Sequence, residues 1–413
     1  MTTVEIMKSR SLSPTDSLNI PESGDGVPDM LNEATWELLW MLKMQREDGG
    51  AYNKLASELW EYRAPEVSEL GGQFVRFFLY RTTHDSATAG ASFALASRMW
   101  APYNTTLSEL FLQRAKQAWS FLQIHPTASP EGGFVNPPGH ISGPYPDVDD
   151  TDNRAWLAAE LYRTTCDQVY GDAYVAYIAS QNNVVGLGGN DFVDYRLEAL
   201  WAFYYSSATC ATANEPSTYA TVRSLIFAAL KQSVSGTKSM AVKNPYRNVG
   251  RLDVPEWIGW GSSGAVNWSH FMGILGWHMF NDRSQLDWVV QSMDVVLGAN
   301  PIATSYITGL GHTYPMDPTQ GQSRTDNVVE PLPGYAVMGP YGHVSLSSPY
   351  FRVAQGDDAN YPSLLQLTSP FPVLRRWSDA NELPQYNEGG VGPLTYLCGL
   401  YQVLNADAQQ TSA

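Results

Sequence analysis

Helix-length segments with apolar residues at helical spacing recur along the chain, and this repetition restricts the fold more than any other feature. The segments arrive in consecutive pairs, joined by loops rich in Gly, Pro, Asn and Asp, and strand-like alternation is scarce. Paired helices of this kind predict an all-α fold with two concentric layers of helices. We expect helices over residues 28–45, 85–100, 107–124, 151–165, 172–180, 195–207, 216–233, 263–280, 283–297 and 390–404, with short strand-like runs at 304–308 and 335–338.

Several of these helices have apolar residues on two faces. In the helix over 28–45, one stripe consists of Leu31, Ala34, Leu38 and Leu42, and the other consists of Trp36, Leu39, Trp40 and Met44. A helix that is apolar on two sides is expected to be buried on two sides. The long stretch 298–380 differs, since it is rich in Pro, Gly and aromatic residues, and loops of that length are usually functional. We therefore expect the substrate cleft there.

The charge of the chain excludes two classes of partner. The 413 residues carry 25 Lys+Arg against 41 Asp+Glu, a formal net charge of −16. Neither duplex nucleic acid nor an anionic membrane surface suits such a chain, because both need a basic face. Aromatic residues make up 12% of the sequence, and their faces suit a neutral, ring-shaped ligand such as a sugar.

One uncharged segment, residues 257–280, raises the alternative of a membrane helix. Ser262, Ser263, Asn267 and Ser269 lie within it, and such polar groups are costly in lipid. A buried helix of a water-soluble core is the better interpretation. At the N-terminus, residues 1–12 lack the apolar region of a signal peptide.

The three cysteines, Cys166, Cys210 and Cys398, are too few and too widely spaced for a disulfide framework. At most one disulfide is available, and we expect buried free thiols. Phosphate-binding GxxxxGK[ST], zinc-binding HExxH and nucleophile-elbow GxSxG motifs do not occur in the sequence. No cofactor is therefore expected, and a structural calcium ion is the one metal alternative.

Carboxylates in aromatic surroundings remain as candidates for chemistry. Glu388 precedes the last predicted helix and has Trp377 and Tyr386 nearby in sequence. A Glu at a helix start is usually a solvated partner of the helix dipole. In apolar surroundings its pKa would instead rise, and it would keep a proton to donate.

Two other charged groups have alternative interpretations. Four acids precede a predicted helix, and they fit either capping and dipole interactions or a hard-cation site. They are Asp147, Asp149, Asp150 and Asp152. The run from Arg375 to Asp379 fits an internal ion-pair network or a grip on substrate hydroxyls.

An ordered set of motifs resembles glycoside hydrolase family 9, the inverting cellulases and their relatives. The first is Asn19-Ile-Pro-Glu-Ser-Gly-Asp-Gly-Val-Pro-Asp29 with its following helix, and the second is Asp48-Gly-Gly-Ala-Tyr-Asn-Lys54. Trp260-Gly-Ser-Ser263, Leu297-Gly-Ala-Asn-Pro301, Ser305-Tyr-Ile-Thr-Gly309 and Glu330-Pro-Leu-Pro-Gly334 follow in the family's order. The resemblance covers about Ser17 to Leu404.

The resemblance implies an (α/α)6 toroid and an inverting hydrolase of β-1,4-linked glucans or related oligosaccharides. Glu388 falls on the family's Asn-Glu motif and would be the general acid. Asn387 and Tyr386 would orient it. Four residues would line the sugar subsites, namely Trp260, Trp377, Arg324 and Asp379.

The sequence departs from the family's pattern at several positions. An inverting glycosidase needs a second carboxyl group as base, and the family's Asp-Ala-Gly-Asp block that supplies it does not occur. Asn53 stands where the family has His, and Arg324 lies where a His-His-Arg substrate clamp is usual. The run from Leu374 to Asp379 resembles members that act on short or amino-substituted oligosaccharides.

These departures lead to an expected organisation and to an alternative function. Residues 1–18 would be a remnant of a first barrel helix, so that the chain looks N-terminally truncated, and residues 19–413 would form the catalytic domain. The alternative is a non-catalytic glycan-binding fragment or pseudoenzyme. The expected partner is a β-linked oligo- or polysaccharide, and the chain is expected to be a monomer. By resemblance it would be secreted, although no signal peptide is visible.

Overall fold

The computed structural model describes residues 1–9, 15–57, 76–140, 143–183, 185–186, 194–211, 215–243, 247, 269–300, 303–316 and 326–337. The chain divides into two compact units. The first comprises Met1–Trp60 and Gly72–Gln232, and the second comprises Glu61–Gly71 and Ser233–Ala413.

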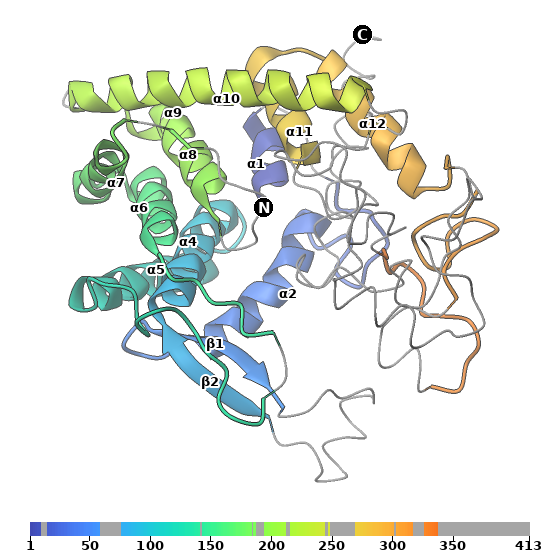
Figure 1. The fold of residues 1–413 in the computed structure, drawn as a ribbon, viewed down its shortest axis with the longest axis horizontal. Coiled ribbons are helices and arrows are strands. Elements are labelled where there is room, and N and C mark those ends of the chain that lie inside the picture. Colours follow the sequence, from blue (N-terminus) through green and yellow to red (C-terminus); the bar gives the residue numbers. More distant parts are fainter. Residues whose placement is uncertain are drawn as a thin grey trace, which may run out of the picture. The chain divides into compact units, whose positions relative to one another are not determined.

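The first unit is built mainly of helices, with one two-stranded sheet (Figure 1). Its elements are α1 (Thr2–Ser9), α2 (Asp29–Met44), β1 (Ala51–Ala56), β2 (Phe77–Thr82), α4 (Thr83–Trp100), α5 (Thr105–Ile124), α6 (Thr151–Thr165), α7 (Gln168–Ser180), α8 (Arg196–Tyr205) and α9 (Ser207–Cys210). Polar side chains fix several helix starts. Thr82 Oγ1 accepts the Asp85 N–H at 3.0 Å, and Asn104 Oδ1 accepts the Leu107 N–H at 3.0 Å.

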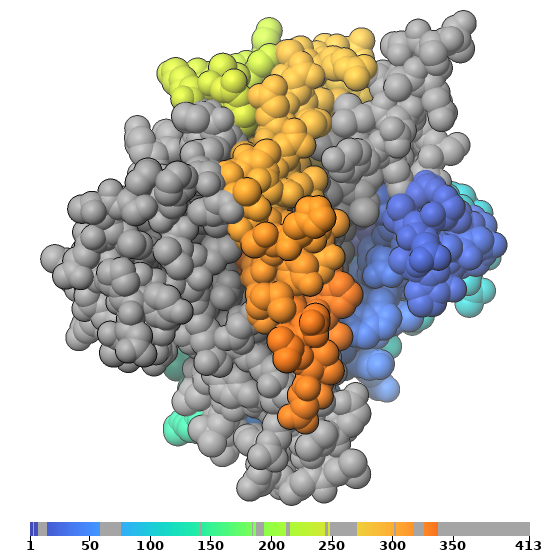
Figure 2. Space-filling view, turned by 90° about the vertical axis from the view of Figure 1, so that its right-hand side faces the viewer, coloured from blue at the N-terminus to red at the C-terminus, as the bar shows by residue number. Residues whose placement is uncertain are grey.

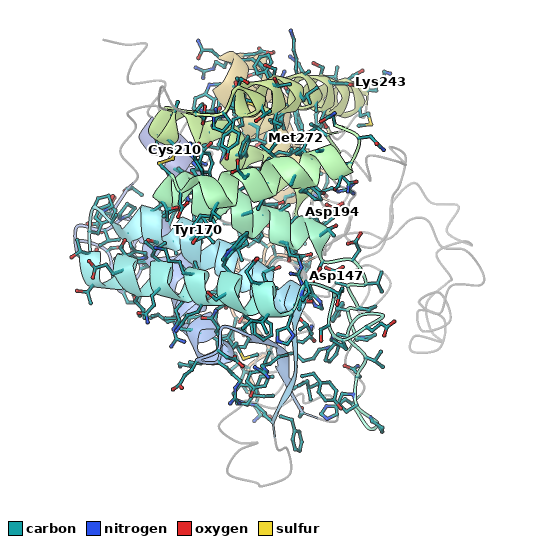
Figure 3. All side chains as sticks on the ribbon, turned by 90° about the vertical axis from the view of Figure 1, so that its left-hand side faces the viewer. Asp147, Tyr170, Asp194, Cys210, Lys243 and Met272 are labelled. Atoms are coloured by element: carbon teal, nitrogen blue, oxygen red, sulfur yellow. A yellow bond between two sulfur atoms is a disulfide. The ribbon has the colours of Figure 1, made fainter. Side chains whose placement is uncertain are left out.

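Helices α4, α6 and α8 run parallel as neighbours. Near their N-termini, the Asn153 side chain of α6 bonds Thr88 of α4, and the Asp152 carboxylate accepts the N–H of Tyr195, which caps α8. Near the other end, Arg98 of α4 bonds Thr164 of α6. In Figure 3, Asp147 and Asp194 lie at one end of this row, and Tyr170 and Cys210 lie at the other.

Helix α5 packs antiparallel on α4 and completes one helical hairpin. Phe93 stacks on Phe111 with 5.8 Å between ring centroids. The Ser108 hydroxyl donates a hydrogen bond to the Ser97 carbonyl, and Gly90 lies against Ala118 two turns earlier in α4. A Cβ on Gly90 would lie 2.6 Å from the Cβ of Ala118, so this close approach requires glycine. The predicted pairing of consecutive helices is confirmed here.

Helix α1 docks by charge as well as by packing. Val4 and Ile6 are fully buried, and the Glu5 carboxylate lies 2.8 Å from Arg98 Nε and 3.0 Å from Arg163 Nη1. Arg98 Nη2 also bonds Glu160 at 2.7 Å. Burial alone would raise the pKa of Glu5, but the two arginines outweigh it and hold that pKa below its ordinary value. The short N-terminal helix is therefore joined to α4 and α6 by a buried network of alternating charge.

On the second face of α2 the sequence prediction was right for Met44, which is buried, and wrong for the other three residues. Leu31 and Leu38 are buried as expected, but Trp36 is 78% exposed, Leu39 46% and Trp40 39%. The helix contacts α4 and β1. The side chains of Trp36, Leu39 and Trp40 are exposed to solvent. Periodicity shows that a face is apolar, but burial also needs a neighbour to cover it.

The antiparallel hairpin of β1 and β2 was not predicted. Its register pairs Ala51 with Thr82 and Ala56 with Phe77. The β2 sequence, Phe-Phe-Leu-Tyr-Arg-Thr, does not alternate between apolar and polar residues, so it lacks the period that reveals a half-buried strand.

The expectation of buried free thiols was also wrong. Cys166 and Cys210 form a disulfide with 5.1 Å between their Cα atoms, and the Cys166 residue is exposed. Cys166 ends α6 in a left-handed conformation at φ 58°, and Cys210 ends α9. A link between residues 44 positions apart depends on the tertiary fold, which spacing alone does not reveal.

Removal of this disulfide is expected to destabilise the first unit. The double variant Cys166→Ser and Cys210→Ser should lose about 2–4 kcal/mol of unfolding free energy, because the unfolded chain regains the freedom of a long loop. Chemical denaturation under non-reducing conditions measures the difference. Cys398→Ser is the matched control and should change nothing, since the only other cysteines pair with each other. Equal stability of all three proteins would contradict the assignment.

The second unit contains the end of α10 (Ser217–Lys243), α11 (Ser269–Phe280) and α12 (Ser284–Val296). Helix α10 continues ten residues beyond the predicted end at 233. Phe271, Ile274 and Leu275 of α11 are buried, as expected for the uncharged segment. No helix among the described residues is long and apolar enough to span a membrane.

The predicted strand-like runs of the second unit meet each other. Val337 N–H donates to Tyr306 at 2.8 Å and Thr308 N–H donates to Tyr335 at 2.8 Å, which makes an isolated bridge rather than a strand. In Figure 2 the described residues from 269 to 337 form one continuous band of colour. The predicted cleft segment, 298–380, lies largely outside the described residues.

Candidate functional site

The sequence-predicted site residues lie outside the described residues. Trp260 falls in the range 248–268, and Arg324 falls in 317–325. Trp377, Asp379, Tyr386, Asn387 and Glu388 all fall in the range 338–413, as does the run from Arg375. Their roles stay predictions.

The structure describes a polar cluster at the N-terminal ends of α4, α6 and α8, which we call the acidic end. Its members are Asn53, His84, Asp85, Asp147, Asp149, Asp150, Asp152, Asn153, Asp194 and Glu198. The N-terminus of a helix carries partial positive charge, so three parallel helix starts favour a gathering of carboxylates. The predicted capping role of the 147–152 acids is confirmed in part. Asp149 Oδ1 accepts the Thr151 N–H at 3.2 Å, whereas Asp150 makes no side-chain cap.

Asp150 forms an ion pair instead of the expected helix cap. Its two oxygens accept bonds from the Arg154 guanidinium at 2.8 and 2.9 Å. The same guanidinium donates to the backbone carbonyls of Leu122 at 3.1 Å and His125 at 2.7 Å. This ion pair therefore fastens the start of α6 to the end of α5.

His84 lies at the centre of the cluster and is nearly buried. Its Nε2 lies 3.1 Å from Asp85 Oδ2, and the Asn53 amide donates to the same oxygen at 2.8 Å. Burial alone lowers the pKa of His84, but the carboxylates of Asp85, Asp147 and Asp150 outweigh it and the net pKa is raised. The strand β1 thus brings Asn53 against the first turn of α4.

Asp147 is buried beside this histidine. Burial raises its pKa to about 6, although the charge of His84 opposes the rise. With the Asn153 amide oriented to satisfy its neighbours, Nδ2 lies 3.1 Å from Asp147 and 3.2 Å from Asp152. Asp147 is therefore a carboxyl group that changes protonation near neutral pH, with a basic partner and an amide to orient it.

Burial also raises the pKa of two further acids of the cluster. Burial raises the pKa of Asp152, and it raises the pKa of Glu198, in the first turn of α8, to about 8.

The cluster has no described metal site. Among the residues that the structure describes, no group of three or more His, Cys, Asp or Glu side chains is arranged to hold a metal ion. Calcium binding stays a prediction.

Sequence reasoning missed His84 and Asp85. The Thr82-Thr-His-Asp85 run has the pattern of a helix cap, which would have marked the start of α4. Their proximity to Asn53 and Asp147 depends on how the hairpin and α6 pack, which no local pattern shows.

Comparison with known proteins decides the family. The model for "Glycosyl hydrolase family 9" matches residues 14–391, nearly the whole chain. The chain belongs to glycosyl hydrolase family 9. The resemblance seen in the ordered motifs is therefore confirmed.

Curated relatives of this family 9 chain are enzymes that act on glucans. Endoglucanase D of Acetivibrio thermocellus is 27% identical over 78% of this chain and 49% of the relative. The xyloglucan-specific endo-beta-1,4-glucanase BoGH9A of Bacteroides ovatus is 26% identical over 84% of this chain and 56% of the relative. The chain thus spans about half the length of the curated relatives it matches.

Solved structures confirm the fold class. A metagenome-derived glycoside hydrolase family 9 endoglucanase matches with a TM-score of 0.73 and 26% identity, over 97% of this chain and 67% of that one. The expected (α/α)6 class agrees with this match and with the helical pairs described above.

Proposed function

We propose that this chain is an inverting glycoside hydrolase of β-1,4-linked glucans or related oligosaccharides. The observation that carries the proposal is the family match over residues 14–391, which includes the position of Glu388. The named activities of the relatives, endoglucanase and xyloglucan-specific endoglucanase, support β-1,4-glucans as the substrate class.

Two carboxyl groups carry out the proposed reaction. Glu388 donates its proton to the glycosidic oxygen as the bond to the anomeric carbon breaks, while a base takes a proton from the attacking water on the opposite face. Asn387 and Tyr386 orient the acid. Trp260 and Trp377 stack on sugar rings, and Arg324 and Asp379 bind hydroxyls.

Among the described residues, Asp147 is the carboxyl group whose own surroundings best suit a general base. It combines burial, a pKa of about 6 and a basic neighbour, and a pKa close to the operating pH favours general base catalysis. A base works when ionised, so activity should rise as the pH rises through about 6.

Replacement of Asp147 tests this role. Asp147→Asn should lower kcat by about 10²–10⁴-fold and remove the rise in the pH–rate profile near pH 6. The matched control is Asp149→Asn, an exposed acid two positions away, which should keep the profile. An unchanged profile in Asp147→Asn, with the protein still folded by circular dichroism, would assign the base elsewhere.

A second function is favoured by one observation, since the family's Asp-Ala-Gly-Asp motif does not occur in the sequence. A chain without a base would bind saccharides without cleaving them. Release of reducing ends from carboxymethyl-cellulose, xyloglucan, cello-oligosaccharides and chitosan oligomers separates the two functions. We expect turnover of β-1,4-glucans, and binding without turnover would establish the alternative.

The disulfide supports an extracellular location. Disulfides persist in oxidising compartments and are rare in the cytosol. The Cys166–Cys210 link therefore agrees with secretion, and we propose that the chain acts outside the cell as a monomer.

A further inference from the structure

The β1–β2 hairpin exposes three aromatic rings in a run of four residues. Phe77 is 40% exposed, Phe78 52% and Tyr80 58%. Phe78 and Tyr80 lie two positions apart in β2 and so on one face of the strand, and we call these two rings the hairpin aromatic surface. Apolar side chains that are exposed singly are ordinary, whereas several together mark a binding surface.

Each ring of this surface is held by a second ring. Phe78 lies 5.0 Å from Tyr52 and Tyr80 lies 6.3 Å from buried Phe134, measured between ring centroids. Contacts of this kind restrict the rotation of the exposed rings. A ligand therefore meets surfaces that are already ordered, which lowers the entropic cost of binding.

The two basic side chains of the hairpin, Arg81 and Lys54, are both bound to other groups of the protein, one to a carboxylate and the other to neutral oxygens. The two strands contain no Asp or Glu, although the chain has 41 acidic residues. Arg81 forms an ion pair with Asp48, and the Lys54 ammonium donates to the Gly143 carbonyl at 2.5 Å and to Asn136 at 3.2 Å. Aromatic faces without a free charge suit a neutral ligand with flat apolar faces and hydroxyl edges, and they offer little to an anionic lipid or an acidic polymer.

The hairpin also continues into the acidic end. Strand β2 passes directly into α4 at Thr82 and Thr83, and Asn53 of β1 donates to Asp85 at 2.8 Å. A ligand chain on the hairpin therefore meets a polar cluster rich in groups that bond hydroxyls.

We propose that the hairpin aromatic surface binds a stretch of β-1,4-glucan chain away from the bond that is cleaved, an inference that rests on the proposed function. The pyranose rings stack on Phe78 and Tyr80. The surface would serve long polysaccharides and leave short substrates unaffected.

Retardation in native gels that contain hydroxyethyl-cellulose or xyloglucan tests the proposal. The variant carrying Phe78→Ala and Tyr80→Ala should bind these polymers about tenfold more weakly, from the loss of two aromatic contacts. Its turnover of a short cello-oligosaccharide should match that of the wild type. Trp36→Ala is the control, since Trp36 is an aromatic ring on α2 that is even more exposed to solvent. Circular dichroism confirms that each variant is folded.

Equal retardation of the wild type and the double variant would overturn the proposal while leaving the hydrolase function intact. The same conclusion would follow if the wild type cleaved short substrates but did not bind the polymers. A protein that neither binds nor cleaves glucans would refute the proposed function and this surface with it. Sedimentation at increasing protein concentration tests the other possible occupant of the surface, a second copy of the chain. Self-association abolished by the double variant, with glucan binding unchanged, would assign the surface to a second copy of the chain.

Discussion

Glu388→Gln is expected to lower kcat on β-1,4-glucans by about 10²–10⁴-fold, the usual contribution of general acid catalysis. Glutamine keeps the size and polarity of the side chain but has no proton to give to the leaving oxygen. The KM should change little, because binding by the aromatic subsites is retained. Reducing-end release over a range of substrate concentrations measures both constants.

Glu131→Gln is the matched control for this variant. Glu131 is exposed in the loop between α5 and α6, so the same change there should leave kcat unaltered. If Glu388→Gln keeps its turnover, another residue supplies the proton. A substrate with an activated leaving group sharpens the test, since it needs no acid and should restore the rate of bond cleavage in the variant.

Glu5→Gln is expected to cause the largest loss of stability, about 3–5 kcal/mol of unfolding free energy, because it leaves two buried arginines with less compensating charge. In the variant, Arg98 keeps its ion pair with Glu160 at 2.7 Å. Arg163 loses the ion pair that it forms with Glu5 at 3.0 Å. A carboxylate whose pKa is lowered in the folded state stabilises the protein at pH values above its ordinary pKa of 4.5. This stabilisation is lost as the pH falls through the pKa of the folded state. Wild type and variant should therefore converge in acid.

Chemical denaturation at pH 7 and at pH 3 measures this difference. Glu33→Gln, an exposed glutamate on α2, is the control and should unfold like the wild type at both pH values. A Glu5→Gln protein that is as stable as the wild type at pH 7 would show that apolar packing of Val4 and Ile6, and not charge, holds α1 in place.

The helices could be predicted from the sequence because local patterns specify them. The bounds of α6 match the prediction at both ends, and those of α12 agree within one residue. The hairpin was missed because β2 does not alternate, and the helical remnant expected within residues 1–18 was given no bounds, whereas α1 spans Thr2–Ser9. Contacts between distant parts of the chain were beyond local patterns. The disulfide and the open face of α2 both depend on which segment lies opposite, and periodicity does not contain that information.

The acidic end shows the same division. The sequence indicated that Asp149 would interact with a helix start, and it does. It did not show that Asp147 would be buried beside His84, since the two residues lie 63 positions apart (147 − 84) and meet only when α4 and α6 pack in parallel. The pKa of Asp147 is raised by this tertiary environment, so the candidate base had no local signal.

The configuration of the first sugar released tests the central claim most directly. Proton NMR, recorded as hydrolysis of a β-1,4-linked cello-oligosaccharide begins, distinguishes the two anomers before they interconvert. Attack of water opposite the leaving group predicts that the α-anomer forms first. Initial formation of the β-anomer, or no cleavage of any β-1,4-glucan by the folded chain, would contradict the account.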